Sequence, residues 1–105
     1  MKRVGFTMRI KPGAAEEYRR RHAEIWPELS AEFRRVGIED YVIYLDPVSH
    51  TLFASQLVSE NDRKSELRGL EVMHRWWDSL AHLMETNPDN SPIVEPLEMV
   101  FELGQ

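Results

Sequence analysis

The stretch YRRRHAEIWPE, residues 18–28, contains a histidine that could transfer a proton. His22 falls one helical turn after Tyr18 and one turn before Ile25 and Trp26, on a stripe of otherwise apolar and aromatic side chains. Imidazole titrates near neutrality, so it can serve as a general acid or base. A lone histidine on an apolar face is more often structural, because two backbone groups satisfy a neutral ring. Position alone therefore leaves both interpretations open.

Aromatic side chains with polar tips accompany this histidine in the sequence, among them Tyr18 and the adjacent pair Trp76 and Trp77. Adjacent helical residues such as Trp76 and Trp77 point about 100° apart, so both reach one cavity only if it is broad. Such a pair more often packs in a core or an interface. Flat aromatic faces with hydrogen-bonding tips nevertheless suit a sugar ring, which has apolar C–H faces and a rim of hydroxyls.

Other kinds of chemistry find little support in the sequence. There is no HExxH motif, no paired histidine and carboxylate at ligand spacing, and no glycine loop for phosphate, so we expect no metal and no cofactor. No serine stands in a nucleophile-elbow context. His50 lies in an expected turn and His82 near a helix end, where solvent or the helix dipole accounts for them, while His74 is ambiguous. The chain has no cysteine, which fits a reducing compartment, and we expect the cytoplasm.

Length and charge define the class of protein. A chain of 105 residues predicts one domain, residues 1–105, and 42% hydrophobic with 30% charged residues is typical of an ordinary globular protein. A formal charge of −5 argues against nucleic acid and anionic membranes as partners. No window has the length of a transmembrane helix, and the apolar segment near the N-terminus is too short for a signal peptide.

The elements that must position these residues follow from two alternating periodicities. Apolar residues at every second position predict strands, and spacings of three and four predict helices. Pro27 should kink or restart the first helical segment, and Gly37 should close it. The expected order is a strand at 4–10, helix at 14–36, strands at 40–46 and 51–58, helix at 62–85 with a possible break near Gly69, and a strand at 97–103. This order predicts a ferredoxin-like split βαβ fold of the α+β class, with two helices on one face of a four-stranded antiparallel sheet.

Two of the expected strands are apolar on both faces. Residues 41–45 and 52–58 carry apolar or aromatic side chains in both phases of the alternation. Helices on one side of the sheet leave the second apolar face without cover, and another copy of the chain is the commonest cover. Isolated exposed apolar residues are the alternative explanation. We expect a homodimer.

The quoted segments also carry a resemblance to a known family. YRRRHAEIWPEL at 18–29, Tyr41 with YLD in the second strand, RWW at 75–77 and NPDNSP at 87–92 together resemble the L-rhamnose mutarotase family, in the same order and spacing over nearly the whole chain. The resemblance implies a homodimeric, cofactor-independent enzyme with a dimeric α+β barrel fold that interconverts the α and β anomers of L-rhamnose. By the same resemblance, His22 matches the proton donor, and the sugar-binding positions are Tyr18, Tyr41, Trp76 and Trp77.

The residue types suit this chemistry, since anomer exchange moves only O–H protons. His22 is assigned as the general acid at the ring oxygen, and the partner base is left open among a tyrosine, a carboxylate and water. Two other functions are compatible with the same fold, because fold does not fix function. One is a small dimeric α+β barrel enzyme resembling cofactor-independent monooxygenases or decarboxylases. The other is a non-catalytic sugar-binding dimer that uses the same aromatic residues.

Overall fold

The computed structural model describes residues 1–104 and shows strands, α-helices and two short 3₁₀ segments within that range. In chain order the elements are β1 (Lys2–Arg9), α1 (Ala15–Ala23), α2 (Pro27–Arg35), β2 (Ile38–Asp46), β3 (Thr51–Val58), η1 (Lys64–Gly69), α3 (Glu71–Leu80), η2 (Ala81–Leu83) and β4 (Glu95–Leu97).

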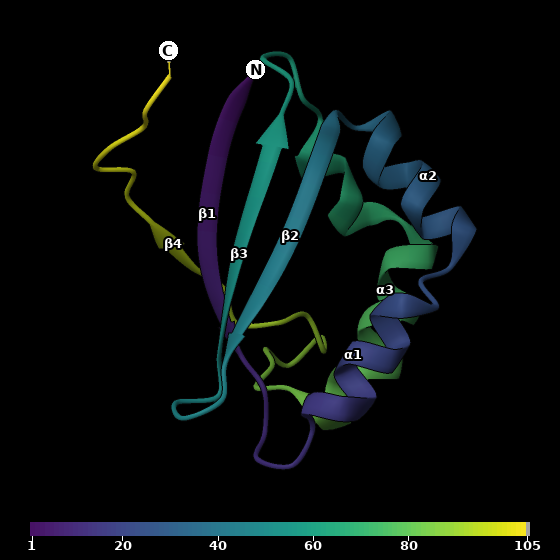
Figure 1. Ribbon diagram of the computed structural model, residues 1–105. Helices are drawn as coiled ribbons and strands as arrows, with labels where there is room; N and C mark the ends of the chain where they lie inside the picture. The colour runs from purple at the N-terminus through teal and green to yellow at the C-terminus, as the bar shows by residue number, and fades with distance from the viewer. Residues whose placement is uncertain (105) are drawn as a thin grey trace.

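The strands form one antiparallel sheet in the order β2-β3-β1-β4. In the register, Phe6 on β1 lies opposite Ala54 on β3, and Tyr41 on β2 lies opposite Gln56. Helices α1, α2 and α3 all lie on one side of the sheet, as Figure 1 shows. This order of strands with helices on one face is the ferredoxin-like split βαβ arrangement, so the predicted α+β fold is confirmed.

The helical region between β1 and β2 is broken at Pro27, as the sequence predicted. Trp26 is extended, with φ −64° and ψ 129°, and Pro27 then opens α2, where its missing N–H would have had no helical partner. Helix α1 ends at Ala23, so His22 lies in its last turn. The break lets α1 present Tyr18 and His22 while α2 buries Leu29 separately.

The second helical region was expected over 62–85 with a possible break near Gly69. The structure instead has the 3₁₀ segment η1, the α-helix α3 and the 3₁₀ turn η2 in succession. Leu70, between η1 and α3, is extended with ψ 134°, so the break near Gly69 is real. The apolar spacing was clearest from Met73 to Met84, and the α-helix covers this stripe only as far as Leu80. Helix α3 buries four residues, Val72, Met73, Trp76 and Leu80.

The last strand was predicted over 97–103, and that prediction is wrong. Strand β4 covers only Glu95–Leu97, which pair with residues 5–7 of β1, and 98–103 have no strand structure. The alternating apolar side chains of this segment lie in solvent: Met99 is 50% exposed and Phe101 75%. Alternation predicts a strand only where one face is buried, and residues 1–104 supply no cover for that face.

The hydrophobic core lies between the sheet and the helices. Its fully buried side chains come from both layers: Ile10, Leu29, Val36, Leu52 and Val58. The opposite face of the sheet is not covered by any helix of residues 1–104 (Figure 1). There Tyr44 is 66% exposed and its cross-strand partner Phe53 is 42% exposed.

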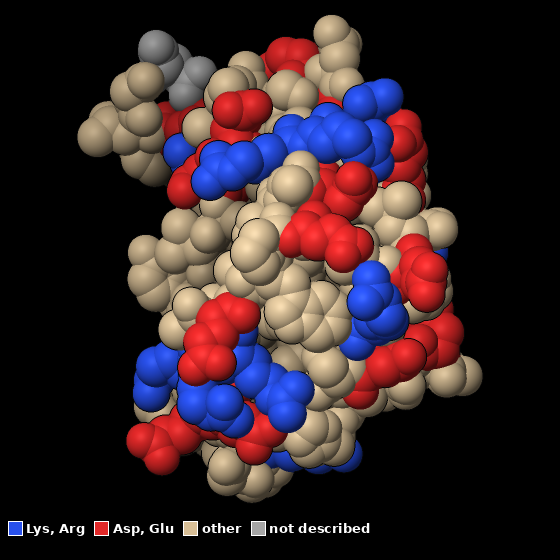
Figure 2. All heavy atoms as spheres, turned by 90° about the vertical axis from the view of Figure 1, so that its right-hand side faces the viewer, with Lys and Arg blue, Asp and Glu red and all other residues tan. Residues whose placement is uncertain are grey.

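The outer surface of the helical layer mixes charges of both signs. Figure 2 views this side and shows lysines and arginines beside aspartates and glutamates, around a centre of uncharged side chains. Several of these residues pair, including Arg21 with Glu17 (2.9 Å) and Arg35 with Glu32 (2.9 Å). No helix in residues 1–104 has the length and apolar character needed to span a membrane.

Candidate active site

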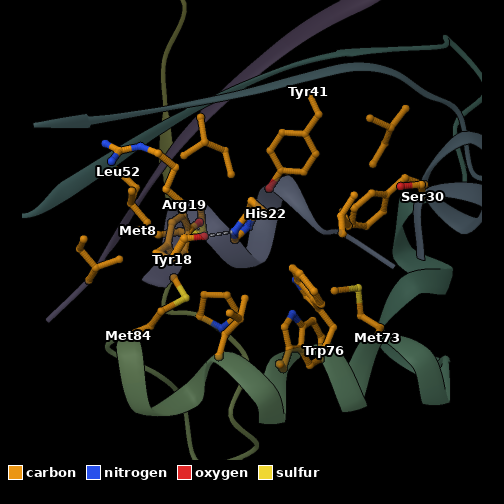
Figure 3. A pocket seen from close by; sticks show the side chains of 18 of the residues that line it. Met8, Tyr18, Arg19, His22, Ser30, Tyr41, Leu52, Met73, Trp76 and Met84 are labelled. Carbon is orange, nitrogen blue, oxygen red and sulfur yellow. Dashed lines mark hydrogen bonds between the residues drawn. The ribbon is translucent and has the colours of Figure 1, made fainter. Parts of the chain in front are cut away.

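A cavity of about 590 Å³ lies between the inner face of the sheet and the helices. This volume is within the range of small-molecule sites. Side chains reach it from β1, α1, α2, β2, β3, α3 and the segment after α3. The residues that sequence reasoning selected all line it: Tyr18, His22, Tyr41, Trp76 and Trp77. Figure 3 shows Tyr18 and His22 on α1, Trp76 on α3 and Tyr41 on the sheet side, pointing into one space.

The hydrogen bond of His22 fixes its tautomer. Nδ1 lies 2.9 Å from the backbone carbonyl oxygen of Tyr18, one helical turn earlier. A carbonyl oxygen only accepts, so Nδ1 carries the hydrogen and donates it. In the neutral ring Nε2 is therefore the unprotonated nitrogen, with its lone pair available for another partner.

Burial lowers the pKa of His22 from its usual value of 6.5, while the hydrogen bond to the Tyr18 carbonyl acts in the opposite direction. The first effect is larger, because the charged imidazolium loses more hydration than the neutral ring. The ring is therefore mainly neutral at pH 7. A neutral imidazole with a free Nε2 can begin a reaction by accepting a proton.

Aromatic rings surround the imidazole on two sides. The Tyr18 ring lies at 4.1 Å between centroids and is tilted by 30°, and Trp76 meets His22 edge-on at 5.4 Å. Trp76 is only 6% exposed and also contacts Trp26 edge-on at 5.1 Å. Trp26 is half-buried, packs against the hydrophobic core and supports Trp76 from outside the cavity.

The tryptophan pair divides between the core and the cavity wall. Trp76 is part of the hydrophobic core as well as the lining, whereas Trp77 is half-buried and also lines the cavity. Trp77 contacts the His74 ring edge-on at 5.0 Å. The cavity is broad enough for both, which adjacent helical positions require.

Tyr41 closes the site from the sheet. Its ring lies 6.3 Å from Phe6 and 5.8 Å from Phe33. Burial raises the pKa of Tyr41 to about 12, opposed by a hydrogen bond from Gln56. Burial and then the nearby Tyr41 raise the pKa of Tyr18 as well. Both phenols are therefore neutral near pH 7 and form hydrogen bonds as neutral groups.

Sequence reasoning missed other residues of the lining, notably Asn90 and Arg19. Asn90 has a left-handed backbone (φ 70°), and its side-chain amide donates to Asp78 at 3.0 Å. Asn90 belongs to the segment NPDNSP, which is part of the family resemblance, so a polar residue within that motif was the signal that could have found it. Arg19 is exposed, and its position beside Tyr18 on α1 gave no signal apart from charge.

The remaining histidines lie outside the cavity lining. His74 bonds through Nε2 to the Arg68 carbonyl at 2.6 Å, and His82 lies 3.4 Å from Glu17. His50 occupies the β2–β3 turn with φ 60°. Among residues 1–104, no cluster of three or more histidines and carboxylates is arranged to hold a metal ion.

Comparison with known proteins identifies relatives over the full length. Residues 3–103 match the L-rhamnose mutarotase family. The chain is 46% identical over 104 residues to an L-rhamnose mutarotase of Paraburkholderia phytofirmans, covering 99% of this chain and 97% of that one. It is also 46% identical to one of Bacteroides thetaiotaomicron, with 98% and 99% covered. The crystal structure of an L-rhamnose mutarotase from Formosa agariphila matches with a TM-score of 0.93, 38% identity and coverage of 99% and 100%.

The fold and the cavity define a class: a ferredoxin-like α+β protein whose inner sheet face and helices enclose a histidine among polar-tipped aromatic residues. Such a cavity suits a small ligand with both apolar faces and hydroxyl groups. The extent of the sequence match then identifies the family. The chain belongs to the L-rhamnose mutarotase family.

Proposed function

We propose that this protein is an enzyme that interconverts the α and β anomers of L-rhamnose. Membership of the L-rhamnose mutarotase family supports the substrate and the reaction. The structural observation that carries the proposal is His22, a neutral imidazole held at Nδ1 by the Tyr18 carbonyl, with Nε2 as the remaining nitrogen in an aromatic-lined cavity.

The proposed chemistry begins with His22 as a base and ends with it as an acid. Nε2 removes the proton of the C1 hydroxyl, and the C1–O5 bond breaks as C1 and O1 form the aldehyde. The electron pair of the broken bond goes to O5, which takes the proton back from Nε2. The open chain turns about the C1–C2 bond, and the reverse sequence closes the other anomer.

One imidazole suffices for this exchange because O1 and O5 are bonded to the same carbon and lie close together. The partner base that the sequence left open then needs no separate residue. The tyrosines are poorly suited as bases, because burial raises the pKa of both Tyr18 and Tyr41. In the second half of the cycle His22 acts as the general acid at the ring oxygen, which is the role assigned to it from the sequence.

The aromatic residues are proposed to bind and orient the sugar. Trp76 and Trp77 offer flat faces to its C–H groups, and the hydroxyls of Tyr18 and Tyr41 are available to its oxygens. No metal or cofactor takes part in this proposal, since only O–H protons move.

Anomer exchange measured by NMR saturation transfer tests the proposal against its alternatives. The protein should exchange the anomeric signals of L-rhamnose without oxygen, added metal or cofactor, and without deuterium entering C2 in deuterated water. A monooxygenase-like enzyme would require oxygen, and a binding module would only shift anomer populations in proportion to protein. Deuterium at C2 at a rate proportional to enzyme would contradict the mutarotase function. The family match already favours the mutarotase reading over these alternatives, and a small panel of related sugars would define specificity.

We also propose that the protein acts as a homodimer in the cytoplasm. The dimer is supported by the uncovered sheet face around Tyr44 and Phe53 and by the exposed apolar residues of 98–103. The location is supported by the absence of cysteine, since such a chain gains nothing from an oxidising compartment.

A further inference from the structure

Gln56 is a polar side chain within an apolar layer. It lies on β3, where the other inward positions are Leu52, Ala54 and Val58, all buried. Only 3% of Gln56 is exposed. Burying an amide without hydrogen-bond partners costs free energy, so its partners should explain why it is there.

Two polar groups hold the amide of Gln56 from opposite ends. The Lys64 ammonium donates a hydrogen bond to Gln56 Oε1. An ammonium group cannot accept, so the amide oxygen must face Lys64 and the NH₂ group must face away from it. Tyr41 is the cross-strand partner of Gln56 on β2. With Oε1 held by Lys64, the NH₂ group is the end of the amide left to meet the Tyr41 hydroxyl, and hydrogen bonding from the Gln56 side chain acts to lower the pKa of Tyr41 against the effect of burial.

Lys64 is itself fixed by its surroundings. It opens η1, where its backbone N–H donates to Asp62 Oδ1 at 3.0 Å. Its ammonium lies 6.0 Å from the centroid of the Phe6 ring. Burial lowers the pKa of Lys64, while Asp62 opposes this effect and Lys2 adds to it. A partly dehydrated ammonium gains from a fixed acceptor, which Gln56 provides.

The orientation of the amide has a consequence for the cavity. A phenol hydroxyl has one proton to donate. When its oxygen accepts from Gln56, that proton must be donated elsewhere. Tyr41 lines the cavity and points toward His22 in Figure 3. A hydrogen bond accepted by the phenol oxygen also polarises its O–H group and strengthens it as a donor.

We propose that Gln56 and Lys64 are positioning residues of this site, which together commit the Tyr41 hydroxyl to donate a hydrogen bond to an oxygen of the bound sugar. The inference rests on the proposed mutarotase function and adds a requirement for the substrate. The sugar must present an acceptor oxygen to Tyr41, and a deoxy sugar that lacks this oxygen loses the contact.

Gln56→Glu is the decisive variant, because it keeps the size of the side chain and can pair with Lys64. A carboxylate cannot donate, so it would take the Tyr41 proton and withdraw it from the sugar. The KM for L-rhamnose should rise about five- to tenfold, as for one lost hydrogen bond, with a smaller change in kcat. A purely structural Gln56 would leave KM unchanged, since the new ion pair holds the same elements together.

Lys64 variants and a matched lysine complete this series. Lys64→Met should also raise the KM for L-rhamnose. Lys64→Arg keeps a hydrogen-bond donor and should have a KM close to that of wild type. Lys11→Met changes an exposed lysine outside the cavity lining and should leave KM unchanged. Equal KM values for Lys64→Met and wild type would remove Lys64 from the proposal.

A double-mutant cycle with Tyr41→Phe tests whether Gln56 acts through Tyr41. Gln56→Glu should have no further effect on KM once the hydroxyl is gone, whereas additive effects would overturn the proposal. The ¹³Cζ NMR signal of Tyr41 supplies a readout without sugar and should move in Gln56→Glu. If wild-type protein exchanges no anomers, the proposed function fails, and an unmoved Tyr41 signal would overturn the positioning role independently.

Discussion

At the scale of single residues, His22 is the group on which the proposed chemistry depends. His22→Ala removes the only ring nitrogen proposed to move protons and should slow anomer exchange by about a hundredfold or more. The measurement is saturation transfer between the anomers of L-rhamnose, with thermal unfolding to confirm that the variant folds. His82→Gln, which changes an exposed histidine outside the cavity lining, is the control. A His22→Ala rate within about threefold of wild type, far below the general-acid factor, would make His22 structural.

The pH profile tests whether the neutral form of His22 starts the reaction. Burial places the pKa of His22 below 6.5, so the rate should level off toward alkaline pH and fall as the pH drops through the lowered pKa. The free energy of unfolding should also fall on acidification. The pKa of His22 is lower in the folded chain than in the unfolded chain, so protonation of His22 as the pH drops favours the unfolded chain. Tyr18 and Tyr41 have raised pKa values and do not titrate in this range. A midpoint of kcat/KM above pH 6.5 would contradict the base-first step.

At the scale of the elements, Gly37 controls the entry into β2. Its φ of 103° is left-handed, and a Cβ there would overlap Ser59 Oγ and lie 3.1 Å from Asp62 Cβ. Gly37→Ala should therefore lower the free energy of unfolding by about 1–3 kcal/mol, measured by urea denaturation. Gly69→Ala is the matched control, because its Cβ would meet no atom within 4 Å. Equal losses in the two variants would show that the strain at Gly37 is relieved by local movement.

Local sequence signals predicted most of these elements, because the formation of a strand or a helix depends largely on residues that are neighbours in the sequence. Alternation found β1, β2 and β3, and Pro27 correctly marked the break between two helices. The order of elements then led to the fold, since few arrangements bury the helices on one side of a sheet. The segment 98–103 failed because its alternation requires a partner surface that residues 1–104 do not supply.

For the site, the sequence predicted which residues line the cavity but not the contacts between them. Helical spacing put His22 and Tyr18 on one face, and family resemblance added Tyr41, Trp76 and Trp77, all of which line the cavity. Their roles in catalysis and binding stay predictions. The tautomer of His22 and the contact of Gln56 with Lys64 depend on three-dimensional distances that no spacing encodes. Asn90 was missed because its place in the lining comes from a loop without periodicity.

At the scale of the whole molecule, one face of the sheet is not covered by any helix of residues 1–104. Tyr44 and Phe53 face each other across β2 and β3 on this side, and both are exposed. The segment after β4 adds further apolar side chains, with Val100 90% and Phe101 75% exposed. Exposed apolar side chains of this number are typical of an interface, and a second copy presents the same complementary surface.

The homodimer is therefore expected in solution at micromolar concentration, and Phe53→Glu should weaken it. A charge at the centre of an apolar interface loses hydration without gaining a partner, so the variant should sediment as a folded monomer at concentrations where wild type is dimeric. Ala31→Glu, on the exposed side of α2, places the same charge on the helical face and should leave the dimer intact. Sedimentation velocity over a range of concentrations distinguishes these outcomes. A wild-type monomer at every concentration would show that the face around Tyr44 and Phe53 tolerates water, and an unaffected Phe53→Glu dimer would place the interface elsewhere.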